Sequence, residues 1–215
     1  MELKTFIFNP FAVNTYLIYD ETKDCVIIDP ACVSDDEKNK LVDFITQNNL
    51  KPVAILNTHG HVDHVAGEAF VKKQYQIPIY AHKADSILRT KAVDKGLVYG
   101  MQIETPPTPD HYLEENESFK FGNSEFKILH LPGHSLGSIA FYSEKDSFII
   151  DGDVLFNGSI GRTDFEDGDL DVLMHSITKK LFALDDNTVV YSGHGPETTI
   201  GNEVRSNPFF LDNVL

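Results

Sequence analysis

The sequence predicts an α/β fold in which strands and helices pack in layers. Short apolar runs of strand length recur along the chain, and amphipathic stretches with a period near 3.6 residues lie between them. Glycine-flanked polar residues follow several of the apolar runs. In α/β folds, such residues gather outside the carboxyl ends of strands, where ligands bind.

Nine apolar runs are predicted to form strands. Each is short, carries β-branched or aromatic residues, and is bounded by residues that favour turns. They are residues 5–8, 14–20, 25–29, 53–56, 77–81, 126–131, 138–143, 147–151 and 188–192.

Three amphipathic stretches are predicted to form helices. The first begins at Ser34, where the S-x-x-E pattern with Glu37 is typical of a capping box. The apolar residues of the three stretches are Leu41, Val42 and Ile45; Val62, Val65, Ala66, Ala69 and Phe70; and Leu170, Leu173, Ile177, Leu181 and Leu184. The Pro-rich, acidic stretch 104–115 is predicted to be a loop. Residues 86–100 are compatible with a helical flap beside a site and equally with ordinary packing.

Composition limits the classes of function. The chain has 215 residues, a formal net charge of −15 and no apolar stretch near the roughly 20 residues of a membrane span. Nucleic acids and anionic membranes are bound by dense basic clusters, so neither partner is expected. Cys25 and Cys32 are too few for a disulfide framework. We expect a single domain, 1–215, without a signal peptide and located in the cytoplasm.

Seven potential metal ligands follow four of the predicted strands: His59, His61, Asp63, His64, His134, Asp153 and His194. Imidazole and carboxylate are ligands for Zn(II) and iron, and seven donors are too many for one tetrahedral ion. Two ions fit if Asp153 bridges them, because a carboxylate offers two oxygens. A histidine taken alone is more often a surface or core residue. We interpret the remaining four in that way: His82, His111, His130 and His175.

The pattern HxHxDH at 59–64, with a later His, Asp and His after strands, resembles the metallo-β-lactamase superfamily. The resemblance implies an αββα sandwich, two mixed β-sheets flanked by helices, with a metal site at one edge. It implies that one metal is held by His59, His61 and His134, that the second is held by Asp63, His64 and His194, and that Asp153 bridges the two. Asp29, at the end of VIID, matches an acid of the family that orients a ligand histidine; a strand-ending turn residue is the alternative.

Three further segments resemble the glyoxalase II group, the hydroxyacylglutathione hydrolases and their short relatives: HLPGHSLGSIAFY, GDVLFNGSIGRTDF and GHGPETTIGNEVRSNPF. Longer members carry a C-terminal helical domain that contacts glutathione, whereas only about 20 residues follow His194 here. We therefore expect a short, single-domain relative. The segment GRTDF, 161–165, also resembles persulfide dioxygenases, which use a single iron held by residues matching His59, His134 and Asp153.

The resemblance and the donor set together predict hydrolysis of a small-molecule acyl thioester of the glutathione type. All seven ligands would act through a hydroxide that bridges two divalent ions, for which Zn(II) is the first expectation and Fe or Mn the alternatives. A mononuclear iron persulfide dioxygenase and a lactonase are the competing functions. Arg162 is a candidate for binding a substrate carboxylate, and an internal ion pair with Asp164 is its alternative role. The sequence does not indicate the oligomeric state.

Overall fold

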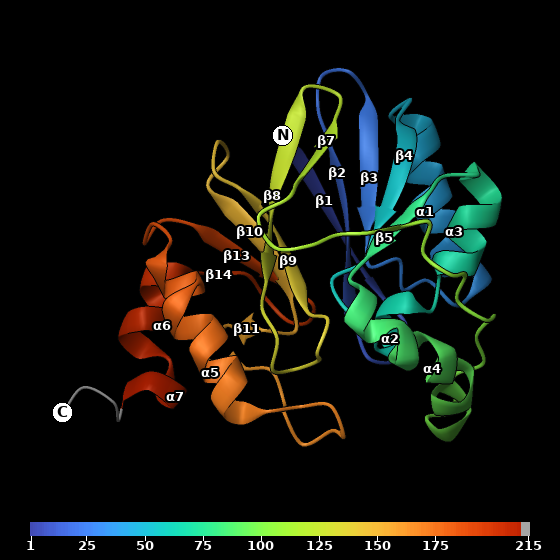
Figure 1. Cartoon of the computed structure of the whole chain (residues 1–215). Coiled ribbons are helices and arrows are strands. Elements are labelled where there is room, and N and C mark those ends of the chain that lie inside the picture. Colours follow the sequence, from blue (N-terminus) through green and yellow to red (C-terminus); the bar gives the residue numbers. More distant parts are fainter. Residues whose placement is uncertain (212–215) are drawn as a thin grey trace.

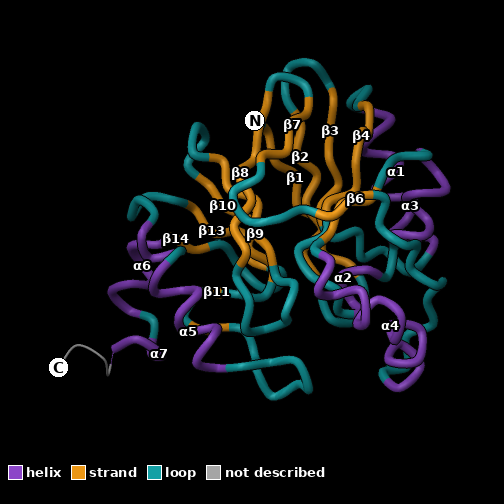
Figure 2. The backbone as a smooth tube through the Cα atoms, viewed as in Figure 1, coloured by secondary structure: helices purple, strands orange, loops and turns teal. Residues whose placement is uncertain are grey.

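Two six-stranded β-sheets face each other, and helices cover the outer face of each (Figure 1). The computed structural model describes residues 1–211. The tube view separates the central strands from the outer helices and shows long loops along one edge of the sandwich (Figure 2). The expected αββα arrangement with two mixed sheets is confirmed.

The first sheet combines antiparallel and parallel pairs. Its strands, in spatial order, are β1 (Glu2–Phe8), β2 (Val13–Tyr19), β3 (Asp24–Ile28), β4 (Lys51–Leu56), β5 (Ile79–Ala81) and β6 (His111–Tyr112). The first three strands pair antiparallel, and β3 to β6 run parallel. The loops that follow β3, β4 and β5 therefore leave from the same edge of the sheet.

The second sheet is largely antiparallel. Its strands, in spatial order, are β14 (Thr198–Thr199), β13 (Val189–Ser192), β10 (Phe148–Gly152), β9 (Ile139–Ser143), β8 (Ser124–His130) and β7 (Ser118–Phe121). Only β10 and β13 run parallel, so the loops after these two strands also share one edge. A small hairpin of β11 (Leu155–Phe156) and β12 (Ser159–Ile160) follows β10.

Alternating side chains hold the layers together. Along β2, Ile18 points into the core between the sheets and packs with residues such as Phe126 and Phe141, whereas Leu17 points to the outer helices. Along β10, Ile150 lies between the sheets and Ile149 faces the helices on the other side. This period of two is what a strand buried on both faces requires.

Seven α-helices are present among the described residues. They are α1 (Asp35–Gln47), α2 (Val62–Val65), α3 (Glu68–Tyr75), α4 (Ser86–Val98), α5 (Leu170–Lys179), α6 (Ile200–Ser206) and α7 (Pro208–Leu211). The Ser34 and Glu37 capping box of α1 is confirmed. Within residues 1–211, no helix has both the length and the apolar character needed to cross a membrane.

All nine predicted strands form, but two helical predictions need correction. The stretch expected as one helix from Val62 to Phe70 is split into α2 and α3, because Gly67 packs against Pro30, to whose carbonyl its amide donates at 2.8 Å. In the third amphipathic stretch, Leu170 is half exposed and does not join the core. The helix α5 ends at Lys179, before Leu181 and Leu184. The loop predicted at 104–115 contains the short strand β6, which completes the parallel edge of the first sheet.

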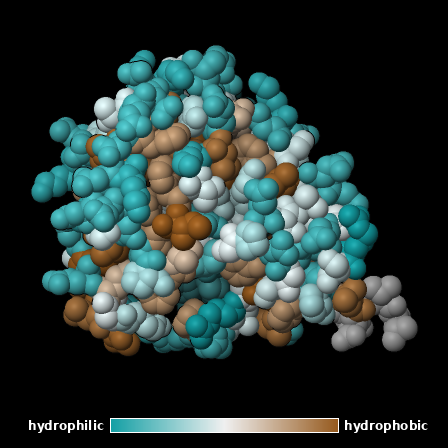
Figure 3. All heavy atoms as spheres, turned by 180° about the vertical axis from the view of Figure 1, so that it is seen from behind, coloured by the Kyte–Doolittle hydropathy of each residue, from teal (hydrophilic) through white to brown (hydrophobic). Residues whose placement is uncertain are grey.

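The molecular surface agrees with the acidic composition. Seen from behind, hydrophilic residues cover much of the face and apolar residues form small separate groups (Figure 3). Scattered apolar residues of this kind are normal on a folded protein.

Candidate metal centre

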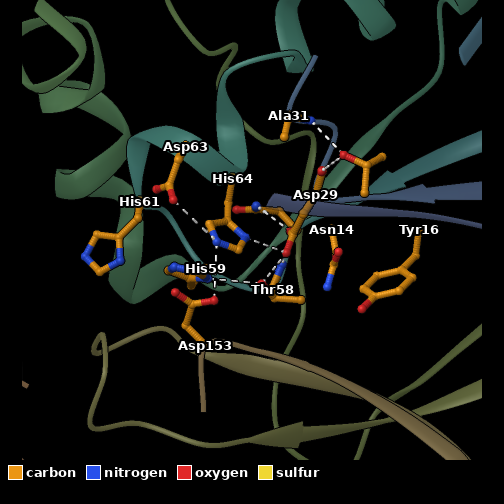
Figure 4. Close-up of polar contacts among 12 residues, drawn as sticks. Asn14, Tyr16, Asp29, Ala31, Thr58, His59, His61, Asp63, His64 and Asp153 are labelled. Atoms are coloured by element: carbon orange, nitrogen blue, oxygen red, sulfur yellow. Dashed lines mark hydrogen bonds and ion pairs between the residues drawn. The ribbon is translucent and has the colours of Figure 1, made fainter. Parts of the chain in front are cut away.

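All four predicted strand-end segments meet at one edge of the sandwich. The segment after β4 carries His59 to His64, and the segments after β8, β10 and β13 carry His134, Asp153 and His194. In the close-up, dashed contacts join His64 to Asp63 and to Asp153 (Figure 4). The seven predicted donors, drawn from both sheets, therefore lie around one centre.

The donors form two groups of three. In the first group, ligand atoms of His59, His61 and His134 all lie within 4.8 Å of one another, and His61 Nδ1 lies 2.8 Å from His134 Nε2. The second group consists of Asp63, His64 and His194. These are the two sets that the family resemblance implies, and the His/Asp cluster fits a metal site.

Asp153 contacts both groups. Its Oδ2 lies 3.6 Å from His134 Nε2 in the first group and 3.5 Å from His194 Nε2 in the second. Its Oδ1 lies 3.4 Å from His64 Nε2 and is buried without a hydrogen-bond donor. A buried, unpartnered carboxylate oxygen between two donor groups is the feature expected of a bridging ligand.

Backbone carbonyls fix the orientation of two of the imidazoles. His134 Nδ1 lies 2.8 Å from the Arg162 carbonyl oxygen, and His194 Nδ1 lies 2.9 Å from that of Phe11. A carbonyl only accepts hydrogen bonds, so each Nδ1 carries a proton and each Nε2 is the nitrogen that points toward the centre.

His59 and His64 are held by side chains in the same way. His64 Nδ1 lies 2.9 Å from Asp29 Oδ2, and His59 Nδ1 lies 3.1 Å from Thr58 Oγ1. His59 Nε2 is buried and has no hydrogen-bond partner. An uncommitted imidazole nitrogen that faces other donors is chemically suited to bind a cation.

Asp29 combines the two roles considered for it. Asp29 directly follows β3 and has a left-handed backbone, φ 48°, so it is a turn residue. Its side chain also accepts hydrogen bonds from His64, from the Thr58 amide at 2.7 Å and from Asn57 Nδ2 at 3.0 Å. One buried carboxylate therefore holds His64 and, through Thr58, the loop that carries His59.

The two groups differ in their affinity for protons. Burial and the neighbouring His64 and His61 lower the pKa of His59 well below its usual value, and burial followed by His134 lowers that of His61 to about 3. Burial also disfavours charge on His64, but Asp153 and Asp63 outweigh it and raise the pKa of His64. His59 and His61 are therefore neutral and ready to coordinate, whereas His64 retains its proton until a cation replaces it.

A family model described as the metallo-beta-lactamase superfamily matches residues 8–194. The chain belongs to the metallo-beta-lactamase superfamily. Hydroxyacylglutathione hydrolase GloC from Haemophilus influenzae is 38% identical over 201 residues, and the match covers 93% of each chain. The chain is thus a metallo-hydrolase of this superfamily.

Two solved structures of the same fold are similar over nearly the whole chain. One, described as the BLEG-1 B3 metallo-beta-lactamase, is 38% identical with a TM-score of 0.89 and is matched over 98% of this chain and 100% of its own. The other, TTHA1623 in a di-iron-bound form, is 39% identical with a TM-score of 0.86 and is matched over 97% and 100%. The descriptions of two reported relatives thus name different activities, and that of a third names two iron ions.

A cavity of about 440 Å³ opens onto the donor cluster. One wall is a single face of α4, and aromatic rings from three other segments complete the lining. The lining outside the donor set includes Phe11, Leu88, Lys91, Ala92, Lys95, Tyr99, Phe156, Arg162, Phe165 and Glu166. The residues of α4 recur at helical spacing, so the segment 86–100 forms a cavity wall.

Arg162 lies at this cavity with its guanidinium already engaged. Its Nε and Nη2 each donate to a separate oxygen of Asp164 at 2.7 Å, and the group lies over the Phe165 ring, 4.2 Å from the centroid. The internal ion pair considered as the alternative role is therefore present. The Arg162 backbone contributes separately, since its carbonyl orients His134.

Sequence reasoning missed several residues of the site. Thr58 gives no signal of its own, because a threonine beside a histidine is unremarkable in a sequence. Asp85 lies outside every motif, yet its buried carboxylate contacts the loops that carry His59, His61 and His134. Lys95 and Tyr99 could have been assigned to a cavity face from their helical spacing.

Proposed function

We propose that this chain hydrolyses an acyl thioester of the glutathione type at a dinuclear metal centre. The observation that carries the proposal is the Asp153 carboxylate, 12% exposed with a fully buried Oδ1, between two triads of donors whose ligand nitrogens face inward. This donor set has the composition for two divalent ions, with Zn(II) as the first candidate and Fe or Mn as alternatives.

The residues divide into two ligand sets and a bridge. His59, His61 and His134 would hold one ion, Asp63, His64 and His194 the other, and Asp153 would belong to both. When bound, the ions would supply a nucleophile by lowering the pKa of water and would stabilise the negative charge that develops on the acyl oxygen. The protein itself fixes the imidazole tautomers through Thr58, Asp29, Arg162 and Phe11.

The chemistry of the thioester explains why no acid is needed for the leaving group. A cysteine-like thiol has a pKa of about 8.5, so it departs readily as the thiolate. Asp63 is half-buried within the second triad, 3.4 Å from His194 Nε2, and its pKa is lowered because His64 and His194 outweigh the effect of burial. A carboxyl that stays ionised is suited to ligation and is a poor proton donor.

The cavity provides a place for the rest of the substrate. Phe11, Tyr99 and Phe165 give it apolar walls. Lys91 lies 3.6 Å from Glu166, and Arg162 is paired with Asp164, whereas Lys95 has no ion-pair partner in the described part of the chain. Lys95 is therefore the cation of the cavity most available to a carboxylate on the thiol part of a thioester.

Hydrolysis of a β-lactam is the second candidate, because the 38% identical BLEG-1 structure is described as a B3 metallo-beta-lactamase. Both reactions attack an acyl carbon and require stabilisation of an oxyanion, so the ligand set alone is compatible with either. A mononuclear iron persulfide dioxygenase and a lactonase are the further alternatives to be separated by assay.

One preparation can decide between these functions. Metal content is measured by elemental analysis, and the same sample is assayed for hydrolysis of S-lactoylglutathione, a β-lactam and a lactone, and for oxygen uptake with glutathione persulfide. Close to two metals per chain with preferential thioester hydrolysis is the expected result. One iron per chain with oxygen uptake, or faster turnover of the β-lactam or the lactone, would overturn the proposal.

A further inference from the structure

Asp85 is a buried carboxylate, only 1% exposed, that ends a short 3₁₀ turn, Lys83–Asp85, directly before α4. Its Oδ2 accepts hydrogen bonds from the Gly60 amide and from Ser135 Oγ, both at 2.8 Å. Its Oδ1 accepts a hydrogen bond from the Gly137 amide at 2.6 Å. No basic side chain of residues 1–211 forms an ion pair with it, so these donors alone compensate the buried charge.

The donors belong to the two loops that carry the first ligand triad. Gly60 lies between His59 and His61, and Ser135 follows His134. These loops come from different sheets, since the first follows β4 and the second follows β8. A backbone hydrogen bond from the Ile139 amide to the Thr58 carbonyl, 2.9 Å, also joins these segments, and Asp85 is the buried side chain that bonds to both loops.

The close packing around Asp85 also explains why residues 60 and 137 are glycines. A Cβ atom added to Gly60 would lie 2.9 Å from Asp85 Cβ, and one added to Gly137 would lie 2.6 Å from Asp85 Cγ. Neither glycine has a positive φ, so the backbone conformation does not require glycine at either position. Close approach of both loops to Asp85 does require it.

Removing this carboxylate would leave the Gly60 and Gly137 amides buried without an acceptor, and the Ser135 hydroxyl would keep only Ser138 Oγ, 2.8 Å away. The loops could then satisfy those groups only by moving apart or by admitting water. Either change would alter the separation of His59 and His61 from His134, because each histidine is within one residue of a group bonded to Asp85.

We propose that Asp85 is a positioning residue that sets the spacing of His59 and His61 against His134 and thereby the metal affinity of the first triad. The inference rests on the proposed metal centre. Asp85 touches no ligand atom and acts only through the two loops. It also connects the triad to α4, whose face lines the substrate cavity.

The test compares metal affinity in variants of the full chain. Asp85→Asn retains the shape of the side chain but replaces one of the two acceptor oxygens by an NH2 group. Ser135→Ala removes one hydrogen bond to Asp85 together with the contact to Ser138 Oγ. Asp20→Asn is the matched control, because Asp20 is a buried carboxylate, 4% exposed, that accepts bonds from Thr22, Asn123 and Ser124. It lies after β2, at the opposite end of the first sheet from the metal loops.

Metal affinity is measured by competition with a chromogenic chelator, and folding of the metal-free protein by circular dichroism. We expect Asp85→Asn to weaken binding by about 10- to 100-fold, Ser135→Ala to weaken it less, and Asp20→Asn to leave it unchanged even where it lowers the melting temperature. The absorption spectrum of the cobalt(II)-substituted protein should change for Asp85→Asn and not for Asp20→Asn.

The outcomes separate this inference from the proposed function. Wild-type affinity in both Asp85→Asn and Ser135→Ala, or an equal loss in Asp20→Asn, would overturn the positioning role and leave the metal centre standing. Should Asp85→Asn fail to fold, an unchanged affinity in Ser135→Ala would decide against the inference. A wild-type chain that binds no metal would overturn both.

Discussion

Asp29 Oδ2 lies 2.9 Å from His64 Nδ1, and both side chains are buried. The same carboxylate accepts a hydrogen bond from Thr58, whose hydroxyl contacts His59. A single acid at the end of β3 thus orients one imidazole in each candidate triad. Such partners of metal ligands fix the tautomer and raise the basicity of the ligand nitrogen.

We predict that Asp29→Asn weakens metal binding by about 10- to 100-fold. Asparagine tolerates the left-handed backbone of this position, but it has one acceptor oxygen where Asp29 uses two. If that oxygen faces the Thr58 amide, the NH2 group faces His64 Nδ1 and cannot accept its proton. Chelator competition on the purified variant measures the loss. Unchanged affinity would show that His64 is held in place without Asp29.

The ligand assignment predicts that His59→Ala and Asp153→Ala each remove activity and deplete metal. His59 has a buried nitrogen with no other partner, and Asp153 contacts both triads, so neither role can be taken over by a neighbour. Elemental analysis and turnover of S-lactoylglutathione are the measurements. His175→Ala is the control, because His175 is exposed on α5 outside the cluster and its loss should change neither quantity. Full activity in either ligand variant would contradict the assignment.

The clustering of the seven candidate donors could be predicted from the sequence because each follows an apolar run that forms a strand. The sequence could not predict which nitrogen of each imidazole faces inward. That choice depends on acceptors far along the chain, such as Phe11, whose carbonyl holds His194 across 183 positions. Asp85 escaped prediction for the same reason, since its partner Gly137 is 52 positions away.

The same holds for the fold: elements with a pattern in their own sequence could be predicted, and elements that depend on contacts with distant residues could not. Long alternating runs such as β2 were predicted, whereas the two-residue strand β6 exists only because β5 lies beside it. The strand β7 was missed although Phe119 and Phe121 alternate with polar residues in its sequence. The break between α2 and α3 depends on contact between Gly67 and Pro30, which no local pattern indicates.

The cavity geometry predicts that Lys95→Ala raises KM for a thioester with an anionic thiol part by about 2- to 5-fold, the range expected for an exposed ion pair. The value of kcat should not change, because Lys95 is not among the donors. The effect should shrink at high salt, and KM for a neutral thioester should stay the same. Lys40→Ala, on the exposed side of α1, serves as the control. An equal rise in KM for the neutral thioester would indicate a packing effect and exclude charge recognition.

Acid stability should depend on Asp20. Burial alone would raise the pKa of this carboxyl, but hydrogen bonds from Thr22, Ser124 and Asn123 outweigh it and lower the pKa to about 2. A carboxyl whose pKa is lower in the folded state stabilises that state above its unfolded pKa, near 3.8, and loses the contribution as the pH falls toward 2.

The measurement is the free energy of unfolding by urea, with a chelator present, for the wild type and Asp20→Asn between pH 6 and pH 2.5. At pH 6 the variant should be less stable by at most about 2.5 kcal/mol, since the pKa falls from 3.8 to about 2 and one pKa unit corresponds to about 1.4 kcal/mol. The difference should narrow as the pH falls below 4, because the wild-type carboxyl then becomes protonated on unfolding. A constant difference across this range would mean that Asp20 stabilises the fold through its shape and neutral contacts, and not through its charge.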